Sequence, residues 1–476
     1  MRQHKRILLV NPLINAEWRV MRPPLGLGYI AENLSRRGIE YDVIDLNLGY
    51  GFKDLHHKMR CFTPDLLGLS LVSLEYKKSY ALINQIKRLN PDIKIVVGGP
   101  HLTILREKVL RECQSIDYGV VSEGEQIVAD LCQTDDNIEE HKGLLLRNGN
   151  EIINTGEGDY VDDLDNISFP RYERFELKKY IQEMNIYTSR GCPHHCIFCP
   201  NKMLFPHYRA RSPQSVLEEL QYWYERGYRH FNFDDDNFNL DKKRVHHMCD
   251  GILGKGMKDL VLRCSNGIRA DFVDRHLLEH MKEAGFKYIA YGVDAANDKT
   301  LKLAKKGESM AVIESAIQET CRLGIGTKLL FVVGIPGETA EDIKDMIALV
   351  KRYPLDDVHF YNLIPYPGTE LYQWIKENDC FLIEPEIYLN DVSCLRYQPL
   401  FETPELSKEE REAIFRELSE VKREITHRAI KRKLKHYPLV NGLAARIFSS
   451  NLVQENFFRN IRFRRTVENF RYRFSH

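Results

Sequence analysis

Three cysteines lie within eight positions of the sequence, at Cys192, Cys196 and Cys199. Thiolates are the usual protein ligands of iron–sulfur clusters, and a compact loop can bring three of them to one cluster. Three protein ligands leave one iron of a four-iron cluster open to a small molecule, as catalytic metal sites generally keep an open position. The spacing therefore predicts a 4Fe-4S cluster held by these three cysteines.

Two other interpretations of the triad stay open on the residues alone. A structural zinc site needs four ligands, and His194 or His195 is available as the fourth, although the chain contains no second, separated cysteine cluster. A disulfide would leave one cysteine over. The other eight cysteines are scattered along the chain, which is typical of small buried side chains in a reducing compartment.

The chain in front of the triad alternates short apolar runs with amphipathic stretches such as 27–37 and 76–89. This alternation predicts a doubly wound, flavodoxin/Rossmann-like α/β domain with a parallel sheet. The predicted strands are residues 6–11, 41–45, 66–70, 94–98 and 116–121. Five strands favour the flavodoxin-like order, in which ligands bind beyond the carboxyl ends of the strands.

Two of these strand ends are rich in glycine. Gly98-Gly99-Pro100-His101 follows one strand, Ser122-Glu123-Gly124-Glu125 follows another, and Ser70 ends a third. Glycine lets a ligand approach the backbone closely. A tight strand-to-helix turn would explain any one glycine, but two such ends on the same edge favour a ligand site.

A second alternation of strands and helices follows a connector rich in aspartate and proline at 159–170. Six strand–helix units predict an open, partial TIM-like (β/α)6 barrel with its site at the carboxyl ends of the strands. The predicted strands are 185–189, 230–233, 261–265, 288–293, 328–333 and 358–363. From about residue 404 the pattern is helical, so we expect three parts: 1–160, 161–403 and 404–476.

The C-x3-C-x2-C spacing, with the aromatic Phe198 just before the third cysteine, resembles the radical S-adenosylmethionine superfamily. The resemblance implies that S-adenosylmethionine chelates the open iron through its amino and carboxylate groups. Reduction of the cluster by an external electron donor of flavodoxin or ferredoxin type then yields a 5′-deoxyadenosyl radical. In such enzymes the cofactors supply the difficult chemistry, and the protein positions and shields them.

Further strand ends of the predicted barrel are similar to those of the same family. Asp235 and Asp236 follow its second strand, where a carboxylate suits the ammonium group of S-adenosylmethionine; a solvated acidic turn is the alternative. Asn266 and Arg269 follow the third strand. Asp294 ends the fourth strand, where relatives often carry Gly-x-Glu-Ser, and it is a candidate ligand of the ribose. With Phe198, these are the residues that the resemblance assigns to this cofactor.

The glycine-rich sheet in front of such a barrel resembles the cobalamin-binding class of these enzymes, over about residues 5–407. The resemblance implies a cobalamin site on that sheet edge, made by Ser70, Gly98, Gly99, Pro100, His101, Glu123 and Gly124. The Asp-x-His-x-x-Gly loop, whose histidine ligates cobalt in other cobalamin proteins, is absent after the first strand. The lower face of the cobalt is then without that ligand, and His101 is a candidate for it.

The resemblance implies an enzyme that methylates an unactivated carbon, with hydrogen abstraction by the adenosyl radical and methyl delivery by methylcobalamin. A cobalamin-dependent radical cyclisation, oxidation or rearrangement without methyl transfer is the alternative. A cobalamin- or redox-sensing regulator would need an output module, and the helical end of the chain carries no helix-turn-helix pattern.

Composition and the two ends of the chain narrow the partners and the location. Lysine plus arginine and aspartate plus glutamate each number 68, so no nucleic acid partner is expected. The start lacks the apolar region of a signal peptide, and no apolar stretch is long enough to span a membrane. We expect a cytoplasmic enzyme with a small-molecule or lipid-like substrate. The basic, aromatic stretch between Lys431 and Phe474 suits either peripheral contact with anionic lipid or a solvated helical face over the barrel.

Overall fold

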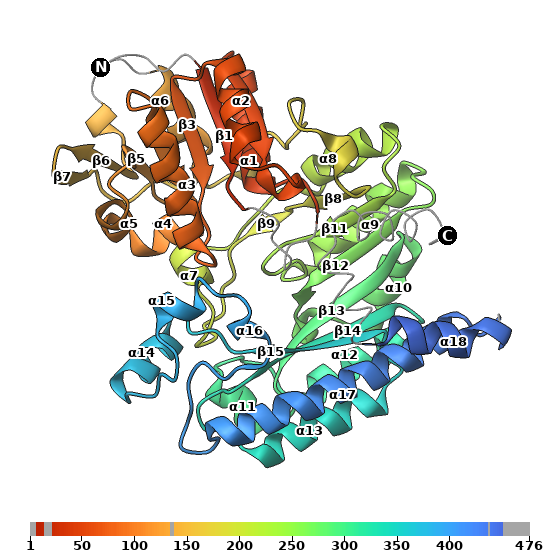
Figure 1. The fold of residues 1–476 in the computed structure, drawn as a ribbon. Coiled ribbons are helices and arrows are strands. Elements are labelled where there is room, and N and C mark those ends of the chain that lie inside the picture. Colours follow the sequence, from red (N-terminus) through yellow and green to blue (C-terminus); the bar gives the residue numbers. More distant parts are fainter. Residues whose placement is uncertain (1–5, 14–20, 134–137, 437, 451–476) are drawn as a thin grey trace.

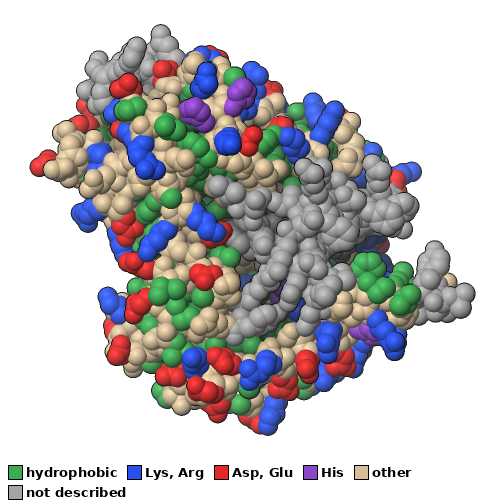
Figure 2. Space-filling view, in the orientation of Figure 1, with side chains coloured by type: hydrophobic (Ala, Val, Ile, Leu, Met, Phe, Trp, Pro, Cys, Tyr) green, Lys and Arg blue, Asp and Glu red, His purple; other side chains and the backbone are tan. Residues whose placement is uncertain are grey.

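The computed structural model describes residues 6–13, 21–133, 138–436 and 438–450 of the 476-residue chain. Two parallel sheets form the framework, and Figure 1 shows the first sheet in red to orange beside the second in green to teal. Positive and negative side chains are interspersed on the face drawn in Figure 2. This mixture agrees with the equal numbers of basic and acidic residues.

The first sheet has the strand order β2-β1-β3-β4-β5 in its parallel part, which confirms the predicted flavodoxin-like fold. Apolar residues dominate β1, β3 and β4, because helices cover both faces of such a sheet, whereas the edge strand β2 carries three acidic residues. The strands are β1 (Arg6–Asn11), β2 (Glu40–Asp45), β3 (Leu66–Ser70), β4 (Lys94–Gly98) and β5 (Tyr118–Val120). The helices are α1 (Leu25–Arg36), α2 (Phe52–Phe62), α3 (Tyr76–Leu89), α4 (Pro100–Leu105), α5 (Glu107–Glu112) and α6 (Glu125–Gln133).

A hairpin extends this sheet beyond the five expected strands. Strand β6 (Leu144–Asn148) pairs antiparallel with β5, and β7 (Glu151–Asn154) pairs with β6. The turn between them contains Gly149 at φ +60°. The hairpin covers the edge of β5, which would otherwise expose unpaired backbone groups. The sequence analysis, which followed the strand–helix alternation, missed it.

The second sheet is an open barrel of six parallel strands in sequential order, as predicted. Its two edge strands, β8 and β15, do not pair with each other in the described structure. The strands are β8 (Glu183–Ile186), β11 (His230–Phe233), β12 (Val261–Ile268), β13 (Phe286–Asp294), β14 (Gly326–Val333) and β15 (Asp357–Asn362). The larger helices outside it are α8 (Pro213–Glu225), α9 (Lys242–Gly254), α10 (Arg275–Glu283), α12 (Met310–Arg322) and α13 (Ala340–Arg352).

The first predicted strand of the barrel, 185–189, is divided in the structure. After β8 the chain bends into a two-residue strand, β9 (Ser189–Arg190), which pairs antiparallel with β10 (Arg209–Ala210). The cysteine triad lies between β9 and β10. Shorter helices lie around the barrel mouth: α7 (Asn201–Leu204), α11 (Asp298–Leu303), α14 (Glu370–Glu377), α15 (Pro385–Tyr388) and α16 (Cys394–Tyr397).

The helical region at the end of the chain packs on the barrel. Helix α17 (Lys408–Lys433) contacts α13 and β15, and α18 (Pro438–Phe448) follows it (Figure 1). Arg411 of α17 is fully buried and donates to the carbonyl oxygen of Val333 at 3.1 Å. The aromatic part of the basic tail, 457–474, lies outside the described residues. No described helix is long and apolar enough to cross a membrane.

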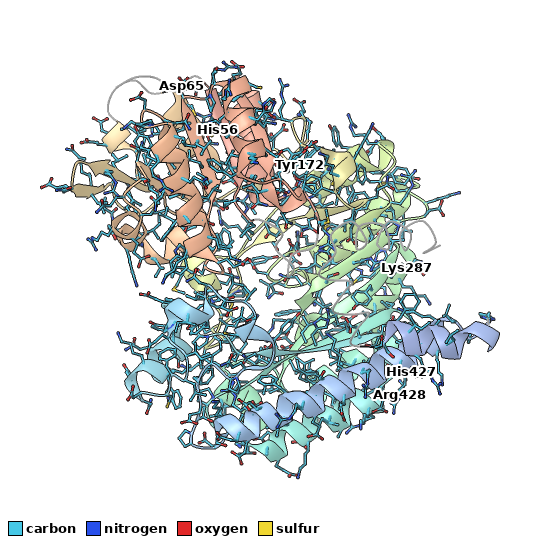
Figure 3. All side chains as sticks on the ribbon, viewed as in Figure 1. His56, Asp65, Tyr172, Lys287, His427 and Arg428 are labelled. Atoms are coloured by element: carbon cyan, nitrogen blue, oxygen red, sulfur yellow. The ribbon has the colours of Figure 1, made fainter. Side chains whose placement is uncertain are left out.

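The connector between the sheets joins the two domains closely. Tyr172, labelled in Figure 3 between α1 and α8, lies with its ring centroid 5.9 Å from that of Trp223. Its ring also covers Gly28 of α1 so closely that a side chain there would have no room. The first sheet ends at Asn154 and the second begins at Glu183, while the boundaries near 160 and 403 stay predictions.

Candidate functional site

The three cysteines occupy one loop at the carboxyl end of the barrel. All three thiols are free, and the backbone N–H of Cys199 donates to the carbonyl of Cys196 at 3.1 Å, which closes a turn. In the part of the chain that the structure describes, no three His, Cys, Asp or Glu side chains converge as ligands of a single metal ion. A 4Fe-4S cluster is larger, and thiols bind it at separate irons. Three thiols on one short loop are the ligand type that such a cluster takes.

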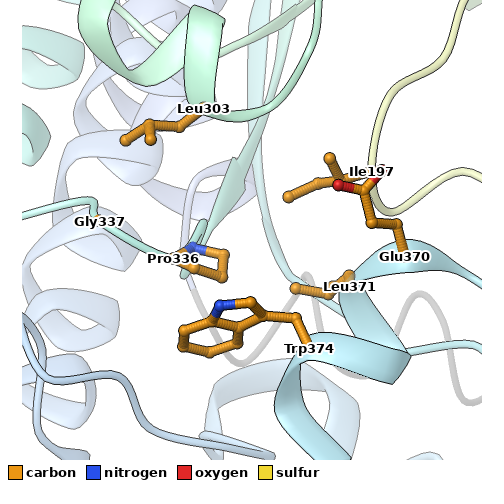
Figure 4. A pocket seen from close by; sticks show the side chains of 7 residues that line it. All are labelled: Ile197, Leu303, Pro336, Gly337, Glu370, Leu371 and Trp374. Atoms are coloured by element: carbon orange, nitrogen blue, oxygen red, sulfur yellow. The ribbon is translucent and has the colours of Figure 1, made fainter. Parts of the chain in front are cut away.

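Ile197 holds this loop against the barrel. Its N–H donates to the carbonyl of Ala304 at 3.2 Å, and its carbonyl accepts from the N–H of Leu371 at 2.9 Å. Its side chain lines a pocket of about 330 Å³ with Leu303 of α11, Pro336 in the loop after β14 and residues of α14 (Figure 4). Because Ile197 directly follows Cys196, these contacts hold the cysteine loop in place on the barrel. The sequence carried no signal for this role.

A buried cation stands near the cysteines. Burial raises the pKa of Cys196 to about 12, and the positive charges of Lys306 and Arg269 oppose that rise. Metal binding requires the thiolate, so these cations favour the ligand form. Lys306 Nζ lies 2.8 Å from Asp294 and 3.6 Å from Glu308. The sequence analysis missed Lys306, because neither a motif nor its spacing marked it.

The two aspartates of the acidic turn have different surroundings. Asp235 is buried and accepts hydrogen bonds from the N–H groups of Thr188 and Ser189, at 2.6 and 2.9 Å. Burial raises the pKa of Asp235 to about 6. Asp236 is exposed to solvent. It accepts from the N–H of Gly191 at 3.0 Å, just before Cys192. Only Asp236 is open to a ligand.

The remaining residues assigned to S-adenosylmethionine also divide into buried residues and residues that solvent reaches. Asn266 is exposed and donates to the backbone carbonyl of Asp235 at 3.0 Å. Asp294 ends β13 in a left-handed conformation, with φ +65°, paired with Lys306. Arg269 is buried and donates to the Lys306 carbonyl at 2.8 Å, so it supports that segment. Phe198 is half-buried against the core.

Five of the residues assigned to cobalamin, namely Ser70, Gly98, Gly99, Pro100 and Gly124, reach solvent at the carboxyl edge of the first sheet. Ser70 and Gly98 lie opposite each other on β3 and β4, next to the switch point between β1 and β3 where ligands of such sheets bind. Gly99 has φ +93°, and a Cβ there would lie 2.8 Å from the carbonyl oxygen of Leu71. The fold itself therefore requires glycine at 99. At Gly124 the nearest atom to a Cβ would be 3.5 Å away. Pro100, also exposed, opens α4.

His101 does not reach this edge, contrary to its suggested role at cobalt. The side chain is fully buried, with its Nε2 3.0 Å from the Tyr80 hydroxyl and its Nδ1 3.2 Å from the Ser73 hydroxyl. Its ring stacks on Tyr76 at 4.5 Å. Burial lowers the pKa of His101 to about 4. Both nitrogens are therefore occupied within the protein, and the histidine serves the packing of α3 against α4.

Glu123 is turned toward the barrel rather than toward the open edge. Its carboxylate accepts from Arg190 at 2.7 Å and from both terminal nitrogens of Arg209, at 2.8 and 3.0 Å. Although burial alone would raise it, the two guanidinium groups hold the pKa of Glu123 below its ordinary value. Glu125 accepts from the other terminal nitrogen of Arg190 at 2.7 Å. The sequence analysis missed both arginines, although Arg190 directly precedes Gly191-Cys192.

Two family models match the chain, one for each sheet. The model of the B12 binding domain matches residues 13–132, and that of the radical SAM superfamily matches residues 186–350. The two matches follow each other in the order of the domains described above. The first contains the glycine-rich edge, and the second contains the cysteine loop.

Curated relatives carry two kinds of names. An uncharacterized methyltransferase of Pyrococcus horikoshii is 29% identical, over 80% of this chain and 85% of the relative. An anaerobic magnesium-protoporphyrin IX monomethyl ester cyclase of Cereibacter sphaeroides is 27% identical, over 78% and 64%. A cytidylyl-2-hydroxyethylphosphonate methyltransferase of Streptomyces wedmorensis is 24% identical, over 78% and 81%.

Solved structures share the fold over most of the chain. The radical S-adenosylmethionine methyltransferase TsrM from Kitasatospora setae superposes with a TM-score of 0.69 at 20% identity, covering 79% of this chain and 76% of its own. The cobalamin-dependent S-adenosylmethionine radical enzyme OxsB also gives 0.69, at 15% identity, over 98% and 72%. Both likenesses concern the arrangement of a cobalamin-type sheet in front of an open barrel.

Proposed function

The chain belongs to the radical S-adenosylmethionine enzymes that carry a B12-binding domain, and from this we propose that it methylates an unactivated carbon of a small-molecule substrate. One observation carries the proposal: the loop after β5, on the ligand edge of the first sheet, is bonded directly to the strand that leads into the cysteine loop. A methyl carrier and a radical generator would thus share one space.

The residues have the following proposed roles. The cofactors, when bound, supply a 5′-deoxyadenosyl radical for hydrogen abstraction and a cobalt-borne methyl group for transfer. Cys192, Cys196 and Cys199 would hold the 4Fe-4S cluster. The residues proposed to orient S-adenosylmethionine are Asp236, Asn266, Asp294 and Phe198, with Asp235 and Arg269 holding them in place. The edge proposed to receive cobalamin is Ser70, Gly98, Gly99, Pro100 and Gly124.

A second reaction is compatible with the same site. The relatives named as cyclases, at 27% identity, favour a cobalamin-dependent cyclisation, oxidation or rearrangement without methyl transfer. The protein parts described above serve either reaction, because both need the radical source and cobalamin side by side.

Labelled S-adenosylmethionine separates the two reactions. The full chain, reconstituted with iron, sulfide and cobalamin, is given a chemical reductant, methyl-labelled S-adenosylmethionine and small-molecule extract of its host. Methyl transfer predicts label in a product together with 5′-deoxyadenosine. A substrate-dependent product without label, formed with 5′-deoxyadenosine, would support the second reaction and contradict the first.

We further propose a flavodoxin or ferredoxin as electron donor, and the cytoplasm as location, because a reducing compartment keeps the thiols available for iron. The residues at the end of α17 bear on the proposed lipid contact. Arg432 and Lys433 pair with Asp356 of the barrel at 2.6 and 3.2 Å, which supports the covering role of that face. A liposome flotation assay with anionic and neutral vesicles tests lipid contact by the tail.

A further inference from the structure

Four buried charges join the two domains at the cofactor edges. Glu123 lies in the loop after β5 and Glu125 opens α6, while Arg190 and Arg209 come from β9 and β10. Each of the four is exposed by no more than 8%. The charges balance, with two carboxylates facing two guanidinium groups. We call these four residues the interdomain quartet.

The bonds of the quartet are directional. Arg190 uses one terminal nitrogen for Glu123 and the other for Glu125, at 2.7 Å each. Its guanidinium carbon also lies 5.0 Å from the ring centroid of Tyr29 on α1. Paired bonds from a planar guanidinium fix orientation as well as distance. The arginine is therefore held by three groups of the first domain.

The second arginine ties the connector to the same point. Arg209 binds both oxygens of Glu123 and donates to the carbonyl of Val161 at 2.7 Å. The N–H of Val161 in turn donates to Glu123 at 3.0 Å. Arg209 and Arg190 lie opposite each other in the β9–β10 ladder. The quartet thus joins the first domain, the connector and the ladder that encloses the cysteine loop.

Burying four charges is a costly way to gain stability, because desolvation offsets most of the attraction. The best-supported use of such groups is to specify one arrangement among several. An apolar contact would allow the two domains to slide past each other. These hydrogen bonds, in contrast, form in only one relative position of the two domains. Cys192 lies two residues from Arg190, and Gly124 lies between the two glutamates. A shift in this relative position moves one cofactor edge relative to the other.

We propose that Arg190 and Glu125 are positioning residues that set the distance and orientation between the cobalamin edge and the iron–sulfur loop. This inference rests on the proposed function only in requiring that both cofactors bind; it does not require that the reaction is a methylation. Neither residue acts on the substrate. Their role is to keep the two cofactors in one fixed relation.

A matched control exists inside the barrel. Arg211 and Glu219 form another buried ion pair, with side-chain exposures of 3% and 2%. Both of its members belong to the barrel, and neither bonds to the first domain among the contacts recorded for the described residues. Glu125→Gln and Glu219→Gln therefore remove the same charge, at similar burial, with and without a connection across the domains.

The experiment measures the dipolar interaction between the reduced cluster and cob(II)alamin by pulsed EPR in the reconstituted full chain. We expect one narrow distance distribution in the parent and in Glu219→Gln. In Glu125→Gln the distribution broadens or shifts, while iron and cobalamin contents stay at parental values. Arg190→Lys, which keeps the charge but only one bond, gives an intermediate result. Product formation in Glu125→Gln falls about tenfold or more, since small misplacements of reacting groups have effects of that size.

Three outcomes overturn the inference. The first is a distribution in Glu125→Gln identical to the parent. The second is the same broadening in Glu219→Gln, which would assign the effect to any buried ion pair. The third is loss of iron or cobalamin in both Glu125→Gln and Arg190→Lys, which would make the residues part of one domain's fold. A parent that shows the narrow distribution but forms no methylated product would refute the proposed reaction and leave this inference standing.

Discussion

Lys306 and Asp294 form a buried ion pair of 2.8 Å in the wall that faces Cys196. They are exposed by 7% and 9%. Glu308, 3.6 Å from the same amine, has a fully buried side chain. Lys306 thus pairs with two carboxylates next to the cysteine loop.

Replacing this lysine is expected to destabilise the barrel. Lys306→Met leaves Asp294 without its cation, and removing one partner of a buried pair costs about 3–5 kcal/mol. Urea unfolding of the cofactor-free chain measures the change in unfolding free energy. Lys299→Met is the control, because that lysine is 55% exposed in its pair with Asp342, and a loss below about 1 kcal/mol is expected there. Equal losses in the two variants would contradict the prediction.

Each cysteine of the triad is expected to be indispensable for the cluster. Cys192→Ala, Cys196→Ala or Cys199→Ala should lower iron well below the parental content and abolish S-adenosylmethionine cleavage, because the cluster then keeps only two of its three cysteine ligands. Iron analysis and 5′-deoxyadenosine assays after anaerobic reconstitution measure this. Cys61→Ala, at an exposed position of α2, should behave as the parent. Full iron in a variant lacking all three cysteines would show that the assignment is wrong.

The acidic turn should respond differently at its two aspartates. Asp235→Asn places an amide where two backbone N–H groups and a hydroxyl donate, so about 1–3 kcal/mol of stability is lost and iron loading falls. Asp236→Asn keeps an acceptor for Gly191 and removes only the charge. It should weaken S-adenosylmethionine binding about tenfold, the effect of losing one charge-assisted bond, with iron unchanged.

Equilibrium binding of S-adenosylmethionine and iron analysis separate these outcomes. If Asp236→Asn binds and cleaves S-adenosylmethionine as the parent does, the turn is not part of the cofactor site. If Asp235→Asn keeps parental stability and iron, its bonds to Thr188 and Ser189 are not needed to hold the loop.

Substitutions at the two glycines of the proposed cobalamin edge should differ in their effect on the free energy of unfolding. Gly99→Ala meets a left-handed backbone and the Leu71 carbonyl, so the cofactor-free chain is expected to lose about 1–3 kcal/mol. Gly124→Ala has ordinary contacts and should leave that stability unchanged while weakening cobalamin binding, since a methyl group would obstruct close approach. Thermal unfolding and cobalamin titration by absorbance test both. Parental cobalamin affinity in Gly124→Ala would remove that residue from the proposed edge.

Glu338 should make stability depend on pH. It is fully buried and accepts from the N–H of Gly334 at 2.7 Å. Burial raises its pKa from 4.5 to about 7, so the folded state binds this proton more tightly than the unfolded state. Its contribution is complete below pH 4.5 and is lost as pH rises to about 7, a change of about 3 kcal/mol.

Urea unfolding at pH 5 and pH 8 checks this sign. Between pH 5 and pH 8 the parent should lose more unfolding free energy than Glu338→Gln loses, because glutamine does not ionise. Glu341→Gln, whose side chain is 76% exposed, should follow the parent. Identical pH dependence in the parent and Glu338→Gln would contradict the prediction.

The local sequence determined most of the strands and helices, and the predicted metal ligands were chosen from it alone. Apolar runs at 6–11, 66–70 and 94–98 became β1, β3 and β4 with unchanged bounds, because a buried parallel strand needs continuous apolar side chains. The cysteine spacing likewise marks the loop in the sequence, although Ala304 and Leu371, distant in the chain, hold it against the barrel. The β6–β7 hairpin was missed because its role, covering the edge of β5, depends on a strand that is distant in the chain.

The tertiary structure decided which strand-end residues reach solvent and which are buried by distant partners. His101 and Glu123 follow equivalent strands beside Gly99 and Gly124, yet Tyr80 and Ser73 hold the histidine in the core, and Arg190 and Arg209 hold the glutamate against the barrel. The separations along the chain reach 86 residues. The partners of His101 lie within the first domain, whereas the arginines that hold Glu123 come from the second, so they meet it only once both sheets have packed together.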